Sequence, residues 1–168
     1  MKRSGITAFA AALLLAAIGC GGDDDSSGEP LSADEQQDLC DRNCSHLETC
    51  DGVDYDTCNT DCLDGAPLLA SGAANDFVDC LTESCDSDQD ACLLDIDLRG
   101  IVQDALDACS DFETRCEIDT QGFCDPNEPE GGALLKLYSD DVLNDLIDCF
   151  AEPCDTVEDC VLSAIGAA

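Results

Sequence analysis

The chain has 168 residues, of which 39 are acidic, 6 are basic and 15 are cysteine, and its formal charge at pH 7 is −33. So acidic a surface would repel nucleic acid and bare anionic lipid, which excludes both as direct partners. Cysteine at about 9% of the residues is typical of a disulfide scaffold. The chain has no Trp and 5 Phe, so we expect covalent bridges to compensate for a thin aromatic core.

The first 20 residues, MKRSGITAFAAALLLAAIGC, have the layout of an export leader. Lys2 and Arg3 precede an apolar run, residues 6–18, that is too short to cross a bilayer, which takes about 20 residues. The run ends in Ala17-Ile18-Gly19-Cys20, which resembles the lipobox of bacterial lipoprotein precursors, although Ala17 stands where that motif usually has Leu. The resemblance implies cleavage before Cys20 and fatty acids such as palmitate on the new terminus. The alternative is an ordinary secretory signal followed by an accidental Cys.

A flexible acidic tether is expected to follow the leader. Cleavage of residues 1–19 would leave 39 acidic residues against 4 basic ones, a formal charge of −35. Gly21 follows Cys20, at a position where Asp commonly causes inner-membrane retention of lipoproteins, so the resemblance favours the outer membrane. Residues 20–32 would form the lipidated Cys and its tether, because they hold Gly, Ser and Asp without apolar periodicity. A random coil of this length spans about 20 Å.

An internal duplication covers the rest of the chain. The segment DFVDCLTESCDSDQDAC, residues 76–92, returns as DLIDCFAEPCDTVEDC, residues 145–160. We therefore expect two Cys-rich helical repeats, over residues 33–95 and 96–168. Six cysteines of each repeat align, in the position pairs Cys44 and Cys109, Cys50 and Cys116, Cys58 and Cys124, Cys80 and Cys149, Cys85 and Cys154, and Cys92 and Cys160. Two more in the first repeat, Cys40 and Cys62, lie opposite Ala105 and Glu128.

The fold class predicted from apolar spacing and helix start signals is all-α, a duplicated array of helical hairpins without a sheet. The expected N-caps are polar residues just before apolar-periodic stretches: Ser32, Asp54, Asn75 or Asp76, Ser87, Ser139 and Thr156. An apolar stripe with helical spacing over residues 98–116 predicts a long helix. At Gly100 this helix either meets the preceding one in a kink or runs on from it as one helix. Pro126 and Pro129 exclude a long helix around Cys124.

The cysteine count predicts about seven disulfides. Lipid on Cys20 would leave fourteen cysteines, an even number in an exported protein. Residues at i and i+4 lie on one helical face, so the two C-x3-C segments within residues 40–62 can meet in two bridges. This pattern is similar to that of twin C-x3-C hairpins such as the α-hairpinins, in which outer pairs with outer and inner with inner. We predict Cys40–Cys62 and Cys44–Cys58, with Cys109–Cys124 as the single counterpart in the second repeat.

The other cysteines of the first repeat, Cys50, Cys80, Cys85 and Cys92, allow three pairings. We favour a bridge between the third and fourth helices across their short turn, which leaves one bridge to the first helix. The pairs expected on this basis in the two repeats are Cys80–Cys92, Cys50–Cys85, Cys149–Cys160 and Cys116–Cys154.

Metal and catalytic sites are weakly indicated. Asp86, Asp88 and Asp90 resemble the first half of an EF-hand calcium loop, but Ala91 stands where the loop needs Gly, so a helix cap is favoured. So acidic a surface admits weak Ca²⁺ binding at millimolar affinity, and we expect no other cofactor. His46 is the sole histidine, and we expect it on the surface of the first helix. Export favours disulfides over zinc at the C-x3-C segments.

No Ser, His or Cys constellation suggests catalysis, so we do not expect an enzyme. The sequence favours a lipid-anchored, surface or periplasmic acidic lipoprotein with a structural or binding role. Its expected partners are the membrane, through the anchor, and a cationic protein or a partner bridged by divalent ions. The alternatives are a divalent-cation-binding surface protein and an accessory subunit of an envelope enzyme.

Overall fold

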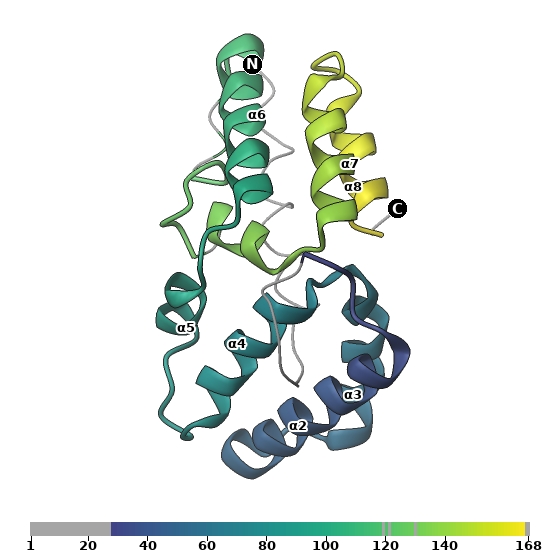
Figure 1. Cartoon of the computed structure of the whole chain (residues 1–168), viewed down its shortest axis with the longest axis vertical. Coiled ribbons are helices and arrows are strands. Elements are labelled where there is room, and N and C mark those ends of the chain that lie inside the picture. The colour runs from purple at the N-terminus through teal and green to yellow at the C-terminus, as the bar shows by residue number, and fades with distance from the viewer. Residues whose placement is uncertain (1–27, 119, 121, 130, 167–168) are drawn as a thin grey trace.

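The computed structural model is all-α over the residues that it describes, which are 28–118, 120, 122–129 and 131–166 (Figure 1). The elements of this part are α2 (Ala33–Asp51), α3 (Tyr55–Gly65), η2 (Ala66–Leu68), α4 (Ser71–Thr82), α5 (Gln89–Asp95), α6 (Gly100–Cys116), η3 (Gly132–Leu137), α7 (Asp140–Ala151) and α8 (Val157–Ala164). Extended pairing in the described residues is limited to two isolated bridges, Pro30 with Ala70 and Leu69 with Tyr138. The expected leader, Cys20 and the expected tether up to residue 27 lie outside the described residues.

Three of the predicted N-caps begin helices as expected. Ser32 accepts a hydrogen bond from the backbone N–H of Glu35, and the Glu35 carboxylate accepts one from the Ser32 N–H at 2.7 Å, which completes a capping box before α2. Asp54 accepts from the N–H of Thr57 before α3, and Ser139 caps α7. These side chains satisfy backbone donors that the first turn of a helix leaves without partners.

The predicted start of the third helix is wrong by about one turn. α4 begins at Ser71, behind Ala70, whose backbone is extended. Ala70 belongs to the bridge with Pro30, so the chain turns helical as soon as that pairing ends. Asn75 therefore lies inside α4, where its side-chain amide donates to the carbonyl of Ser71 at 2.8 Å.

Two further caps differ from the prediction. Asp88, and not Ser87, is the N-cap of α5, and its carboxylate accepts from two backbone N–H groups of the first turn. A carboxylate is the better acceptor for this position because it also opposes the positive end of the helix dipole. Thr156 precedes α8 as expected, but its hydroxyl donates to the carbonyl of Pro153 at 2.9 Å and makes no capping bond.

Both expectations for Gly100, a kink and a continuous helix, are wrong, because α5 ends at Asp95 and Gly100 is the first residue of α6. Arg99 is the N-cap with an extended backbone, and Leu98 lies before the helix with 44% of its surface exposed. The extended backbone allows the Arg99 side chain to turn back toward the centre of the molecule, as described below.

The two repeats meet around a local pseudo-two-fold axis. Leu69 and Tyr138 align with the same offset as Cys80 and Cys149, and they pair with each other in the antiparallel bridge. The residue after each donates its backbone N–H to the residue before the other: Ala70 to Leu137 at 2.8 Å, and Ser139 to Leu68 at 2.9 Å. Two hydrogen bonds between aligned positions relate the repeats as two subunits of a symmetric dimer would be related.

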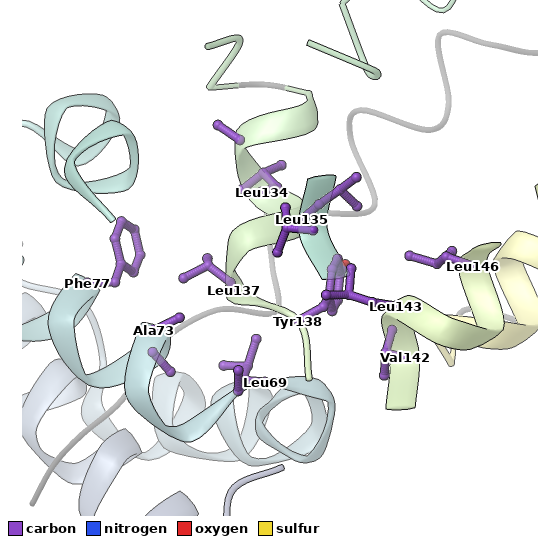
Figure 2. Packing of buried hydrophobic residues seen from close by; sticks show 14 of the residues in the cluster. Leu69, Ala73, Phe77, Leu134, Leu135, Leu137, Tyr138, Val142, Leu143 and Leu146 are labelled. Atoms are coloured by element: carbon purple, nitrogen blue, oxygen red, sulfur yellow. The ribbon is translucent and has the colours of Figure 1, made fainter. Parts of the chain in front are cut away.

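One continuous core joins the two repeats. In Figure 1, α2 to α5 occupy the lower part and α6 to α8 the upper part, with η3 between them. Every residue from 131 to 139 is buried, and this segment carries Leu135, Leu137 and Tyr138 between Phe77 of α4 and Leu143 of α7 (Figure 2). Apolar burial, which contributes about 25 cal/mol per Å², therefore concentrates at the junction of the repeats.

Candidate functional site

The fourteen cysteines of the described residues form seven disulfides with the partners predicted from the sequence. The pairs are Cys40–Cys62, Cys44–Cys58, Cys50–Cys85, Cys80–Cys92, Cys109–Cys124, Cys116–Cys154 and Cys149–Cys160. Cα atoms of Cys40 and Cys62 are 5.7 Å apart, within the range that a disulfide requires. Five bridges join neighbouring segments: α2 to α3, α4 to α5, α6 to the turns after it, and α7 to α8. The other two join α2 to the turn after α4 and α6 to the turn after α7.

The acidic segment that resembles half of an EF-hand is a turn that leads into α5. Asp86 and Asp90 are exposed, and Asp88 is engaged in capping. Within the described residues, no group of three or more His, Cys, Asp or Glu side chains is placed to hold a metal ion. His46 is half-buried on α2, with Nδ1 3.8 Å from Sγ of Cys50.

The four basic residues of the described part of the chain each connect two parts of the fold. On the outside, Arg42 of α2 forms an ion pair with Asp79 of α4 at 2.6 Å. Arg115 of α6 donates to the carbonyl of Phe150 at 2.5 Å, at the C-terminal end of α7, and its guanidinium lies 6.0 Å from the centre of the Phe112 ring. Cations are favoured at this end of a helix because unpaired carbonyls collect there.

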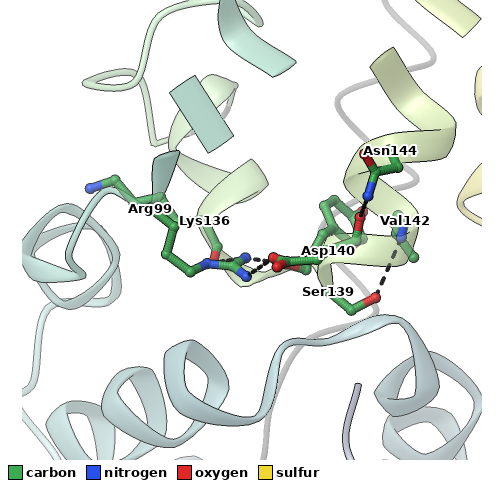
Figure 3. Close-up of polar contacts among 7 residues, drawn as sticks. Arg99, Lys136, Ser139, Asp140, Val142 and Asn144 are labelled. Atoms are coloured by element: carbon green, nitrogen blue, oxygen red, sulfur yellow. Dashed lines mark hydrogen bonds and ion pairs between the residues drawn. The ribbon is translucent and has the colours of Figure 1, made fainter. Parts of the chain in front are cut away.

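Arg99, the residue before α6, reaches the segment between η3 and α7 within the second repeat, beside the junction with the first (Figure 3). Its guanidinium donates to Asp140 Oδ1 at 2.5 Å, to the carbonyl of Lys136 at 3.3 Å and to the carbonyl of Tyr138. Only 11% of the Arg99 side chain is exposed, against 49% for Asp140. Burial lowers the pKa of the Arg99 guanidinium, and Asp140 opposes this shift. Because arginine stays charged in proteins, this is a permanent cation inside the junction.

Lys136 is the second buried cation of the junction. Its Nζ donates to the carbonyls of Leu93 at 3.5 Å and Leu94 at 3.0 Å, at the C-terminal end of α5. Burial lowers the pKa of the Lys136 ammonium, and the nearby Asp95 and Asp97 partly offset this. The side chain thus ties the buried 131–139 segment to α5.

Residues 28–31, which we had expected to belong to the flexible tether, are instead built into the same junction. The carbonyls of Gly28 and Glu29 accept from the N–H groups of Asp140 at 2.7 Å and Ser71 at 2.9 Å. Asp140 and Ser71 are the first residues of the aligned helices α7 and α4, so the tether uses equivalent donors of both repeats. A Cβ on Gly28 would lie 1.6 Å from Asp140 Oδ1 and 2.2 Å from an Arg99 nitrogen. The chain therefore needs glycine to cross the ion pair this closely.

Carboxylates crowd together where α4 faces the segment after α5. Burial raises the pKa of Asp76, and the neighbouring charges of Asp79 and Asp97 raise it further. Nearby carboxylates disfavour the ionised form of Asp76 because their negative charges repel its own.

A shallow groove of about 580 Å³ lies between α6 and α7. Its lining is mainly apolar and consists of Ala108, Asp111, Phe112, Thr114, Arg115, Ile147, Phe150 and Ala151. The Phe112 and Phe150 rings at its floor are 5.9 Å apart. Because Arg115 is already hydrogen-bonded to α7, the groove offers apolar surface with no free cation among these lining residues.

No protein-family model matches the chain, and comparisons with curated proteins and with solved structures find no significant similarity. Among the described residues, no helix is both long and apolar enough to cross a membrane.

The junction of the repeats was not anticipated from the sequence. Its signal was present in GGALLKLYS, residues 131–139, an apolar segment directly after a stretch rich in Pro, Gly and acidic residues. Lys136 and Arg99, two of the few basic residues in so acidic a chain, were a second signal. A buried carbonyl needs a hydrogen-bond donor, and a basic side chain can supply one.

Proposed function

We propose that the chain is a lipoprotein of the bacterial cell envelope, held on the outer membrane through Cys20, that binds cationic proteins or peptides without catalysis. The lipobox and the acidic tether support the anchor. The distribution of charge in the fold supports the binding role, as follows.

The observation that carries the proposal is the use made of the basic residues. Arg42, Arg99, Arg115 and Lys136 are all engaged in contacts within the fold, with carbonyls or with a carboxylate. The charge presented outward is therefore almost entirely negative. A field of one sign attracts oppositely charged partners and accelerates their association. Such a surface needs no enclosed pocket.

Binding of a cationic peptide to the full chain in detergent micelles tests this function. We expect an oligo-lysine peptide to bind with an affinity that falls steeply with salt, and an oligo-glutamate peptide of equal length not to bind. The variant D141N/D145N/D148N removes three exposed acids of α7 and should bind more weakly with a shallower salt dependence. Equal binding of both peptides, or none of oligo-lysine, would refute the proposal.

The same assay with Ca²⁺ distinguishes the alternative of a divalent-cation-binding surface. Saturable Ca²⁺ binding below the millimolar range, without binding of oligo-lysine, would replace the proposed function with that alternative. Weak competition by Ca²⁺ at millimolar concentration is expected of any polyanionic surface.

Metabolic labelling with a tagged fatty acid tests the anchor by itself. We expect the exported chain to carry the label and the Cys20→Ser variant to lose it. Label retained in the variant would overturn the anchoring part of the proposal, whatever the peptide assay shows.

A further inference from the structure

The seven disulfides of the described residues fall into two structural classes. Five join neighbouring segments: α2 to α3, α4 to α5, α6 to the turns after it, and α7 to α8. Two link these units: Cys50–Cys85 ties α2 to the turn after α4, and Cys116–Cys154 ties α6 to the turn after α7. Each of these two is thus the sole disulfide between the two halves of its repeat in the described structure.

The same two bridges are the most accessible in the described structure, because only they contain an exposed cysteine. Each of the other five contains at least one buried cysteine, namely Cys40, Cys44, Cys92, Cys109 or Cys149. Cys85 and Cys154 are exposed, and their partners Cys50 and Cys116 are half-buried. Thiol–disulfide exchange requires a thiolate to reach a sulfur, so access separates the linking bridges from the rest.

His46 distinguishes the two accessible bridges from each other. Its Nδ1 lies 3.8 Å from Sγ of Cys50, one turn along α2. The residue four positions before Cys116 is Phe112, which is buried in the core. Cys50 and Cys116 both lie at the C-terminal ends of aligned helices, so the helix dipole disfavours a thiolate on both alike. The imidazole of His46 therefore distinguishes the surroundings of Cys50 from those of Cys116.

We propose that Cys50–Cys85 is a thiol-exchange site, opened selectively by a dithiol reductant, with His46 assisting the departure of the Cys50 sulfur. The inference does not depend on the binding function proposed above. It assigns a reactive role to a bridge that would otherwise count as one staple among seven.

The exchange proceeds in two steps. A reductant thiolate attacks Sγ of Cys85, the exposed sulfur; the Cys85–Cys50 bond breaks, and its electron pair leaves on Cys50 as a thiolate. An N–H of the His46 imidazole can hydrogen-bond to this thiolate, which lowers the free energy of the departing state. The second thiol of the reductant then attacks the reductant's own sulfur in the mixed disulfide. The reductant leaves as a disulfide, and Cys50 and Cys85 each end as a thiol.

Opening this bridge would remove the disulfide that links the two halves of the first repeat in the described structure. The α2–α3 pair would keep its two disulfides and the α4–α5 pair its single one. Core packing, the hydrogen bond from Ser71 to Glu35 at 3.1 Å and the exposed ion pair Arg42–Asp79 would remain between α2 and α4. Exposed ion pairs contribute only about 0–1 kcal/mol. The first repeat can therefore loosen without losing its local hairpins.

Timed partial reduction of the full chain in detergent tests the proposal. Native protein is treated with dithiothreitol, quenched with an alkylating reagent, and mapped bridge by bridge by mass spectrometry. We expect Cys50–Cys85 to open first, Cys116–Cys154 second and the other five much later. In the His46→Phe variant, which reproduces the residue type of the second repeat, Cys50–Cys85 should open about tenfold more slowly, the effect of one hydrogen bond to a charged group.

Two results would overturn the proposal. One is opening of any other bridge before Cys50–Cys85 in the native protein, a measurement that needs no variant. The other is an unchanged opening rate in His46→Phe, provided that its circular dichroism matches the native chain. The Cys116–Cys154 bridge is the internal control in both samples, because His46→Phe should leave its rate unaltered.

Discussion

Replacing Arg99 by Met should destabilise the protein far more than replacing Arg42 by Met. Both changes remove one positive charge and insert the same side chain, so their effect on the net charge is identical. The two arginines differ in burial and in their partners. Arg99 is 11% exposed and donates to a carboxylate and two carbonyls, whereas Arg42 is 39% exposed and pairs with a carboxylate that is 67% exposed.

The expected magnitudes follow from those contacts. Hydrogen bonds from a charged donor contribute about 1.5–3 kcal/mol, and a buried acceptor left without a donor costs about 1–3 kcal/mol. Asp140 is half-exposed, so water can solvate it after the change, and we count mainly the carbonyls of Lys136 and Tyr138. Arg99→Met should therefore cost about 2–4 kcal/mol. Arg42→Met should cost about 0–1 kcal/mol, as is typical of an exposed ion pair.

Urea unfolding of the full chain, followed by circular dichroism with the disulfides intact, measures the difference. The comparison is made at one salt concentration, because screening changes the contribution of net charge. If both variants lose the same free energy of unfolding within about 0.5 kcal/mol, the junction does not depend on Arg99 as argued. A third variant, Arg99→Lys, should recover only part of the loss, because an ammonium cannot reproduce the fork of the guanidinium.

Three further predictions concern single positions. Asp76→Asn should raise the melting temperature at pH 7, because a raised folded-state pKa means that folding disfavours the ionised form; the gain should fade as pH falls through that pKa toward the ordinary 3.8, and Asp145→Asn, at the aligned position, should gain less. The pKa of Glu35 is lowered by hydrogen bonds with Ser32, so Glu35→Gln should cost well under 1 kcal/mol at pH 7 in urea unfolding, and the difference should vanish in acid below that lowered pKa. The double variant C40A/C62A should fold and lose about 2–4 kcal/mol in urea unfolding, whereas either single change should yield scrambled disulfides on a non-reducing gel.

The sequence predicted the all-α class and the cysteine partners because both depend on short-range regularities. Ser32 and Asp54 cap helices through residues three positions away, and i, i+4 spacing places Cys40 and Cys44 on one face. The aligned repeats then reduced the possible pairings. The start of α4 was misplaced because Ala70 is held extended by contacts distant in the sequence, which no local pattern contains.

The candidate site was hidden for the same reason. Arg99 appeared in the sequence as a residue within an apolar helical stripe. Its role depends on carbonyls of Lys136 and Tyr138, about forty positions away. At Gly28 the segment before α2 passes close to the ion pair between Arg99, at the start of α6, and Asp140, at the start of α7. Such contacts follow from the pseudo-two-fold arrangement of the repeats, which the duplication suggests but does not specify.

The two repeats stabilise the same plan by different means. The second repeat lacks the bridge equivalent to Cys40–Cys62, and irregular turns replace the helix equivalent to α3. In its place, Phe112 and Phe150 pack 5.9 Å apart beneath Arg115, at positions where the first repeat has the half-buried residues His46 and Leu81. An aromatic pair contributes about 0.5–1.5 kcal/mol beyond its apolar burial, comparable in total to one disulfide. The first repeat thus relies more on covalent links and the second more on packing, so the opening of one linking bridge should loosen the first repeat more than the second.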